Sequence, residues 1–132
     1  GLDEGYDSVN NPKWGDTIRK SAFGEVDHAI ELGGASTLPQ TIKATRVGGE
    51  ISLIGILGGN DSEFNPLPII MKSIKLQGIF VGSIAMFNRM NSSIKQNKIK
   101  PVIDKVFKFE NSLDAFAHMA KGNHFGKICI SI

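Results

Sequence analysis

Three strand-like apolar runs of this chain carry glycine at their carboxyl ends, in residues 26–34, 50–55 and 75–83. Helix-like segments separate the runs, and this alternation predicts an α/β fold with parallel strands covered on both faces. In such sheets a ligand binds outside the carboxyl ends of the strands. Glycine there lets a flat ligand approach the backbone closely. The pattern therefore predicts a nucleotide or cofactor site at these strand ends, although simple turns would equally explain the glycines.

The elements that must position this site follow from apolar periodicity and from helix caps. Helices are predicted over residues 14–23, from Ser36 to Gly48-Gly49, over 67–73 and 85–98, and from Asn111 to Lys121, with a loop over 57–66. The apolar runs supply strands over 26–32, 50–55 and 75–83, and two more follow over 102–109 and from Gly126 onward. The last two alternate apolar and polar residues, which predicts half-buried, antiparallel strands. This change in the residue pattern of the strands predicts a domain boundary near residue 84.

The three histidines do not have the spacing of a zinc site. His118 and His124 are separated across a predicted helix end, and the single cysteine is distant from His28. Zinc ligands in proteins recur at short, regular spacings that this arrangement does not match. A surface or structural role is therefore the favoured interpretation of all three.

Two strand acids, one serine and one cysteine are residues whose types could serve in catalysis. Glu31 and Asp27 lie on the first strand, and a strand-end carboxylate bonded to nearby backbone is favoured over general acid–base work because no second group pairs with either. Cys129 lies inside an apolar strand, where cysteine usually acts as a small hydrophobe. Ser52 has no G-x-S-x-G context, so serine hydrolase chemistry has no support.

Composition excludes several classes of protein. The 132 residues carry a net charge of +2, which is too small to predict a nucleic-acid or anionic-membrane partner. The longest apolar stretches are strand-sized, so no membrane span is predicted. A single cysteine rules out an intramolecular disulfide, and together with the absence of a leader-like opening it predicts a cytoplasmic location.

Five motifs in register resemble the medium-chain dehydrogenase/reductase family, which includes the zinc-type alcohol dehydrogenases and the quinone reductases. The motifs are Asp27–Gly34, Gly48–Gly55, Leu76–Ser83, Ile99–Asp104 and His124–Ile130. Each is weak alone, but together they cover nearly the whole chain in order. The resemblance implies a C-terminal fragment of a longer protein.

The fold that this resemblance implies is the C-terminal half of a Rossmann-type doubly wound parallel sheet, followed by a segment that returns to the catalytic domain. Residues 1–83 would belong to the dinucleotide-binding domain, and residues 84–132 would form the helix-strand-helix-strand segment of the catalytic domain. No G-x-G-x-x-G phosphate turn occurs in the chain, and no acidic residue can be assigned to a ribose hydroxyl. The resemblance therefore implies that this chain holds only part of a cofactor site.

The resemblance also implies site residues and partners. The expected cofactor contacts are strand-end residues together with one lysine: Gly33, Gly34, Ile54, Gly55, Ile56, Phe80, Val81, Gly82 and Lys127. A solvated strand-end lysine is the favoured alternative for Lys127. The cofactor would be NAD or NADP, with an alcohol, aldehyde, ketone, quinone or enone as substrate. Family zinc ligands lie upstream, so the chain itself holds none.

The implied activity is hydride transfer by the full-length protein, with the isolated chain inactive. The strand over 75–83 would lie at the sheet edge and pair with its mate in a homodimer. A non-catalytic nucleotide-binding or interaction module is the alternative, but it would need a phosphate-gripping turn that these residues lack. A flavodoxin-like α/β enzyme is a weaker alternative, which the alternating tail disfavours.

Overall fold

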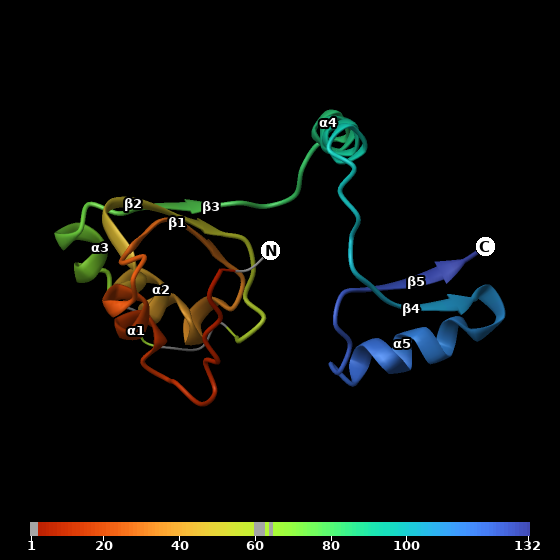
Figure 1. Ribbon diagram of the computed structural model, residues 1–132, viewed down its shortest axis with the longest axis horizontal. Helices are drawn as coiled ribbons and strands as arrows, with labels where there is room; N and C mark the ends of the chain where they lie inside the picture. Colours follow the sequence, from red (N-terminus) through yellow and green to blue (C-terminus); the bar gives the residue numbers. More distant parts are fainter. Residues whose placement is uncertain (1–2, 60–62, 64) are drawn as a thin grey trace. The chain divides into compact units, whose positions relative to one another are not determined.

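The computed structural model describes residues 3–59, 63 and 65–132, and the chain divides into two compact units, Gly1–Val81 and Gly82–Ile132. Part of the predicted 57–66 loop, residues 60–62 and 64, lies outside the described residues. The first unit contains α1 (Trp14–Lys20), β1 (Val26–Glu31), a 3₁₀ turn (Gly34–Ser36), α2 (Leu38–Ala44), β2 (Thr45–Leu53), α3 (Leu67–Met71) and β3 (Lys75–Gly78) (Figure 1). The second contains α4 (Ile84–Gln96), β4 (Ile103–Lys108), a 3₁₀ turn (Phe109–Asn111), α5 (Ser112–Ala120) and β5 (Lys127–Ser131).

The first unit is built on a parallel three-stranded sheet in the order β1-β2-β3. Ala29 pairs with Ile51, and Ile51 pairs with Leu76, so all three carboxyl ends lie at the same edge. Parallel neighbours need a crossover connection, and α2 and α3 supply the crossovers. The predicted α/β class with parallel strands is confirmed, and β3 is an edge strand of this sheet.

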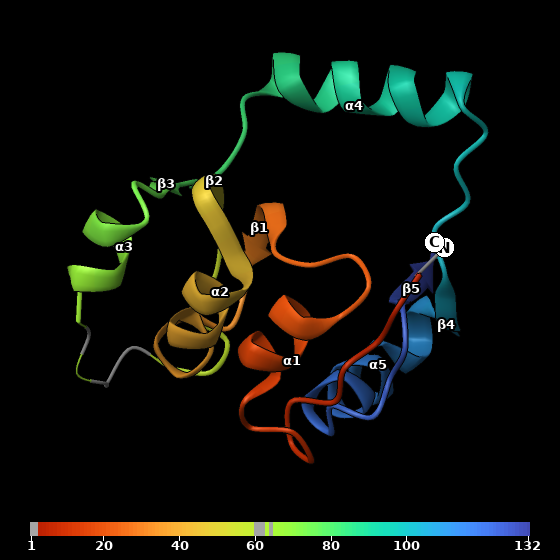
Figure 2. The same cartoon turned by 60° about the vertical axis from the view of Figure 1, so that its left-hand side comes forward.

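The core of this unit lies between the sheet and its helices. Leu38 and Ile42 of α2 pack with Ile51 of β2, which is 0% exposed, and with Ile74 before β3. Figures 1 and 2 show α1 beside α2, on the same side of the sheet. Ile42 follows Leu38 by four residues, so both side chains lie on one helix face, toward the sheet. This apolar layer fixes the strand ends relative to α2.

The opposite face of β1 is uncovered, which corrects the prediction of two covered faces for this strand. Ile30 is 59% exposed and His28 is exposed, whereas Ala29 and Glu31 face the helices. Within the described part of the first unit, the helices pack on one face only. An apolar run therefore indicated a strand but not what covers its second face.

The third strand is shorter than predicted. β3 ends at Gly78, whereas the sequence predicted strand through Ser83. The last ladder bond runs from the N–H of Ile79 to the carbonyl of Leu53 (2.9 Å). After Leu53 the second strand turns toward β1, because the N–H of Ile54 donates to the carbonyl of Glu31 (2.9 Å). The chain after Ile79 therefore has no strand to pair with in the described unit.

The predicted helix from Ser36 to Gly48-Gly49 is also shorter. Ser36 closes a 3₁₀ turn, and α2 begins at Leu38, with Pro39 tolerated in its first turn. The helix ends at Ala44, because Thr45 already pairs with Val26 of β1. Gly48 and Gly49 lie within β2, where the register shifts between Val26 and His28. The glycine pair thus accommodates an irregularity of the strand.

The two strands of the second unit are parallel, so the antiparallel prediction is wrong. The physical reason is the connection: α5 lies between β4 and β5 and returns the chain to the start of the sheet, as a crossover does. Along β4 only Phe107 is buried, and the apolar Ile103 and Val106 are exposed, so both faces of this strand are largely open. Alternation carries no information on strand direction.

Candidate functional site

The carboxyl ends of β1, β2 and β3 meet through backbone hydrogen bonds. The N–H groups of Ile54 and Gly55 both donate to the carbonyl of Glu31, at 2.9 and 3.3 Å. Ile79 is joined in turn to the carbonyl of Leu53. The structure therefore brings together the ends of the three glycine-bearing runs, as parallel pairing requires.

Beyond these ends, the loops after β1 and β2 are joined backbone to backbone. Leu57 donates to the carbonyl of Leu32 (3.0 Å), and Gly58 donates to the carbonyl of Gly33 (2.7 Å). In the opposite direction, Ala35 donates to the carbonyl of Gly59 (3.1 Å). The two loops thus form one connected rim at the strand ends.

The glycines of this rim are required by contacts within the protein. A Cβ at Gly33 would lie 2.2 Å from Thr37 Oγ1, and one at Gly55 would lie 2.9 Å from the carbonyl oxygen of Leu32. Gly34 has a φ of +79°, and its Cβ would lie 2.8 Å from the Cα of Ile56. These separations are too short for real side chains. Contact between the two loops explains Gly34 and Gly55, and contact with Thr37, just before α2, explains Gly33. Gly82 differs, since its Cβ would meet only Met86, no nearer than 3.6 Å.

Glu31 ends β1 and is the most enclosed acidic residue of this region, with 3% of its surface exposed. Its Oε1 accepts from the N–H groups of Gly33 (2.7 Å) and Gly34 (2.9 Å) and from the hydroxyl of Thr37 (2.5 Å). Its Oε2 accepts from the hydroxyl of Thr41. Burial by itself would raise the pKa of this carboxyl, but the bonds from Thr37, Thr41 and the two glycines hold the pKa below its usual value. The predicted backbone-bonded carboxylate is confirmed.

Sequence reasoning missed the two threonines that complete this arrangement. Thr37 precedes α2 and Thr41 lies within it, and a separation of four residues places both hydroxyls on one helix face. Thr41 is 5% exposed and Thr37 is half-buried. Two threonines four residues apart, following a strand that ends in glutamate, were the sequence pattern that could have predicted these bonds to Glu31.

The segment after β3 offers backbone groups that are not used by the fold. Phe80 is 91% exposed and Val81 is 80% exposed. Within the part of the chain that the structure describes, no hydrogen bond involves the N–H groups of Phe80, Val81 or Gly82. The N–H groups of Ile54 and Gly55, by contrast, are already occupied.

Two of the predicted site residues belong to the second unit. Gly82 is its first residue, directly following Val81 in the chain, and Lys127 begins β5. Lys127 is exposed, and its ammonium has no ion-pair partner among the described residues. Within the first unit, the structure gathers Gly33, Gly34, Ile54, Gly55 and Ile56 at one rim.

Two histidines of the second unit lie close together. His118 Nε2 lies 2.8 Å from Asp104 Oδ2, and the N–H of Phe125 donates to Asp104 Oδ1 (3.0 Å). The bond from His118, followed by that from Phe125, lowers the pKa of Asp104. The Nδ1 atom of His124 is buried without a partner among the described residues. Among the described residues, no group of three histidine, cysteine, aspartate or glutamate side chains could hold a metal ion.

The remaining candidates have ordinary partners. His28 Nε2 lies 2.8 Å from Ser52 Oγ across β1 and β2, and Asp27 Oδ1 pairs with Arg46 Nε at 2.5 Å. Cys129 is a half-buried free thiol. Both contacts join β1 to β2, which agrees with the structural role favoured for His28.

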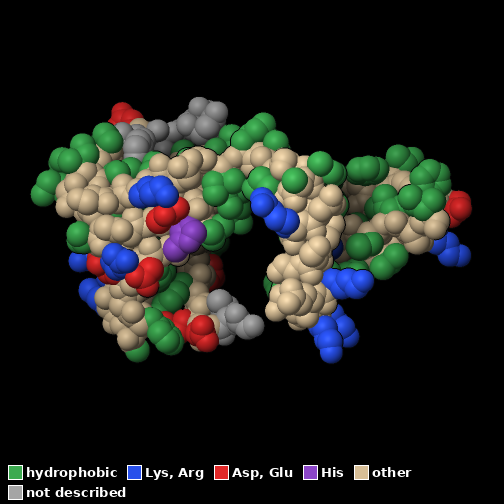
Figure 3. All heavy atoms as spheres, turned by 90° about the horizontal axis from the view of Figure 1, so that it is seen from above, with side chains coloured by type: hydrophobic (Ala, Val, Ile, Leu, Met, Phe, Trp, Pro, Cys, Tyr) green, Lys and Arg blue, Asp and Glu red, His purple; other side chains and the backbone are tan. Residues whose placement is uncertain are grey.

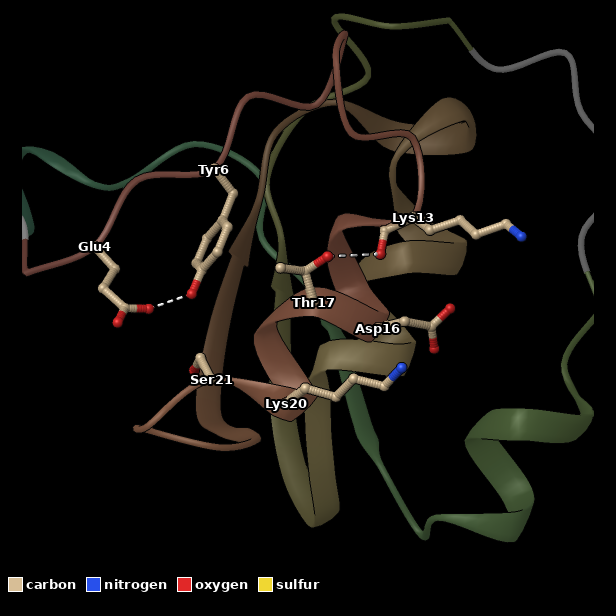
Figure 4. A pocket seen from close by; sticks show the side chains of 7 residues that line it. All are labelled: Glu4, Tyr6, Lys13, Asp16, Thr17, Lys20 and Ser21. Atoms are coloured by element: carbon tan, nitrogen blue, oxygen red, sulfur yellow. Dashed lines mark hydrogen bonds between the residues drawn. The ribbon is translucent and has the colours of Figure 1, made fainter.

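A cavity of about 600 Å³ lies elsewhere in the first unit (Figure 4). It lies between the N-terminal segment and α1, and is lined by Glu4, Tyr6, Lys13, Asp16, Thr17, Lys20 and Ser21. The Tyr6 hydroxyl donates to the Glu4 carboxylate, a bond that raises the pKa of Tyr6 together with burial. None of the predicted site residues lines this cavity, and its mixed charges select no ligand class.

Apolar side chains remain on the surface of both units (Figure 3). In the second unit, Gly82, Ser83, Met86, Phe87 and Met90 line a hollow of about 340 Å³ along the start of α4. None of the described helices is both long and apolar enough to span a bilayer.

The chain is similar in sequence to known dehydrogenases and quinone oxidoreductase-like proteins. The sequence model of the zinc-binding dehydrogenases matches residues 1–96. A zinc-type alcohol dehydrogenase-like protein of Schizosaccharomyces pombe is 36% identical over 92% of this chain and 36% of its own length. The quinone oxidoreductase-like protein 2 of Mus musculus is 28% identical over 89% of this chain and 36% of its own length. The chain thus spans about a third of these relatives.

Solved structures agree with this fold. A candidate alcohol dehydrogenase from Sinorhizobium meliloti 1021 superposes with a TM-score of 0.87 and 32% identity, over 100% of this chain and 38% of its own. An NAD-dependent alcohol dehydrogenase, 21% identical, superposes with a TM-score of 0.81 over 93% of this chain and 36% of its own. The second of these likenesses is one of fold alone.

Proposed function

Because the chain belongs to the zinc-binding dehydrogenase family, we propose that it forms part of a longer oxidoreductase that transfers a hydride between NADH or NADPH and a small substrate. The substrate class is an alcohol, aldehyde, ketone, quinone or enone. The relatives' names divide between alcohol dehydrogenase-like and quinone oxidoreductase-like proteins, which supports this range. Nothing observed favours the non-catalytic alternative.

One observation carries the proposal: three parallel strands end together beside backbone groups that the fold leaves unused. Ile54 and Ile56 are 44% and 59% exposed at this edge, and Val81 follows β3 with its N–H unpaired among the described residues. An apolar surface next to free backbone groups suits a flat aromatic ring that carries an amide. The nicotinamide, when bound, supplies the hydride chemistry, and the protein supplies binding and orientation.

The residues present fit only this end of a dinucleotide. The chain has no G-x-G-x-x-G turn to hold the pyrophosphate, so that contact would come from elsewhere in the longer protein, with Lys127 as an additional candidate. Zinc does not fit the described residues, because they contain no suitable ligand cluster. What these residues can do is hold the ring at the strand ends and exclude water from one of its faces.

The strand β3 also supports a proposed homodimer. Its outer edge is unpaired in the described sheet, and Ile79 beyond it is 44% exposed. Lys75 is the one charged residue of β3, and an open edge with so little charge favours addition of a strand from a second copy. A monomeric mass in light scattering of the complete protein would exclude this arrangement. We further propose a cytoplasmic location, because a chain with a single cysteine, Cys129, fits a reducing compartment.

The test is titration of the complete polypeptide with NADH and with NADPH, followed by turnover assays with alcohols, ketones and enones. Val81→Pro removes the unpaired N–H, and Val81→Ala keeps it as the matched control. We expect the proline variant alone to bind the cofactor several-fold more weakly. Failure of the wild-type protein to bind either cofactor would overturn the proposal.

A further inference from the structure

The buried Glu31 carboxylate has no role in the proposed hydride transfer, yet it is the most heavily bonded side chain at the strand ends. It accepts from two backbone N–H groups and two hydroxyl groups. Hydrogen bonds to an ionised acceptor are stronger than bonds between neutral groups. Breaking these four hydrogen bonds would therefore cost considerable free energy.

The four donors come from two different elements. Gly33 and Gly34 lie in the loop after β1, whereas Thr37 precedes α2 and Thr41 lies within it. The helix is itself held against the sheet by Leu38 and Ile42 of the core. The carboxylate therefore ties the loop after β1 to α2.

This loop supports the next loop. The carbonyl of Gly33 accepts from Gly58 at 2.7 Å, and the carbonyl of Leu32 accepts from Leu57 at 3.0 Å. A shift of the first loop would break both bonds. It would also change the close approach of Gly34 to Ile56, where an added Cβ would lie 2.8 Å from the Cα.

We propose that Glu31 is a positioning residue, whose ionised carboxylate fixes the loop after β1 and, through it, the position of residues 54–59 at the cofactor edge. This inference rests on the proposed function for its effect on cofactor binding. Its structural part, the coupling of Glu31 to Leu57 and Gly58, does not. The lowered pKa of Glu31 agrees with a carboxylate that stays ionised at neutral pH.

The experiment uses three variants of the complete polypeptide. Glu31→Gln keeps the shape but replaces one acceptor oxygen with a donor that faces existing donors. Thr41→Val removes one hydroxyl and retains the branched shape. Thr41→Ser keeps the hydroxyl, so it is the conservative variant that should restore wild-type behaviour.

The first readout is amide hydrogen exchange. We expect the exchange of Leu57 and Gly58 to accelerate about tenfold in Thr41→Val and more in Glu31→Gln. Thr41→Ser should match the wild type. The N–H of Gly48, which donates to the carbonyl of Lys72 at 2.7 Å, is the internal control and should not change. Equal acceleration at Gly48 would show general destabilisation and overturn the positioning role.

The second readout is the dissociation constant for the better-bound nicotinamide cofactor. We expect it to rise about tenfold in Glu31→Gln and about threefold in Thr41→Val, with no change in Thr41→Ser. If Glu31→Gln does not fold, Thr41→Val carries both readouts. A wild-type protein that binds neither cofactor would refute the proposed function, while the exchange data would still decide the coupling. Wild-type affinity in Thr41→Val, alongside unchanged exchange, would refute the positioning role.

Discussion

Replacing Gly34 with alanine tests whether close contact between the two loops holds the strand ends in place. Gly34 has a φ of +79°, and a Cβ there would lie 2.8 Å from the Cα of Ile56 and 3.0 Å from the carbonyl oxygen of Gly59. Both neighbours are backbone atoms, which cannot rotate away as the end of a flexible side chain can. The substitution therefore combines a strained backbone with a collision.

Gly24 separates these two effects. Its φ is +69°, and a Cβ there would meet no atom within 4 Å. Gly24→Ala should cost about 1–2 kcal/mol for the left-handed conformation alone. Gly34→Ala should incur this same cost and a further ~1–3 kcal/mol for crowding. The difference between the two variants isolates the contact between the loops.

The assay is urea denaturation followed by the fluorescence of Trp14, the only tryptophan of the chain and a residue of α1 in the first unit. With a slope of about 2 kcal/mol per molar urea, the Gly34→Ala midpoint should lie about 1 M below that of Gly24→Ala. Coincident midpoints would refute the reasoning, because they would show that the 54–59 loop yields to an added methyl group at no cost.

Further predictions concern a half-buried lysine, the pH dependence and a helix cap. Lys72→Met should lower the unfolding free energy by about 2–3 kcal/mol, because the ammonium bonds one carboxylate and three carbonyl oxygens. The control is Lys75→Met, at a side chain that is 63% exposed. In the same urea assay it should change the unfolding free energy by under ~0.5 kcal/mol. The pKa of Glu31 is lowered on folding, so its stabilisation is complete above its unfolded pKa of about 4.3 and is lost as the pH falls through the lower native pKa; acid titration of Glu31→Gln should show a flatter loss of stability. Ser83→Ala removes the hydroxyl that accepts from the N–H of Met86 at 3.2 Å, so that amide should exchange about fivefold faster, and Ser83→Thr, which keeps a hydroxyl, should not show this effect.

Local patterns were enough to predict the elements and the parallel first sheet, but not the direction of the second. Strand–helix alternation requires crossovers, and crossovers force β1, β2 and β3 to run in parallel. The same rule applied to β4, α5 and β5 would have predicted a parallel pair. The antiparallel prediction came from the apolar–polar alternation of these two strands, and alternation bears on the burial of a strand's faces, not on its direction. Connectivity was the stronger signal in both units.

The candidate site was predictable as an edge of the sheet, but not as a set of side-chain contacts. Parallel strands ending in glycine placed Gly33 and Gly55 together, and backbone bonds join their loops. The convergence of Thr37 and Thr41 on Glu31 depends on the packing of α2 against the sheet, which no local pattern encodes. Lys127 lies in the second unit, so its proposed role depends on the longer protein.

The glycines at the strand ends show why one residue type can support two interpretations. Seen along the chain, glycine after a parallel strand indicates that a ligand approaches the backbone. In the structure, the space beside Gly33 is filled by Thr37, and the space beside Gly55 by the carbonyl of Leu32. Gly55 lets the second loop approach the first, and Gly33 makes room for Thr37 at the start of α2. Any ligand would meet the surface that the joined loops present. Binding of the cofactor would then depend on how firmly the two loops are held. Under this proposal Glu31 contacts no ligand, but its hydrogen bonds fix the loops that form the cofactor edge.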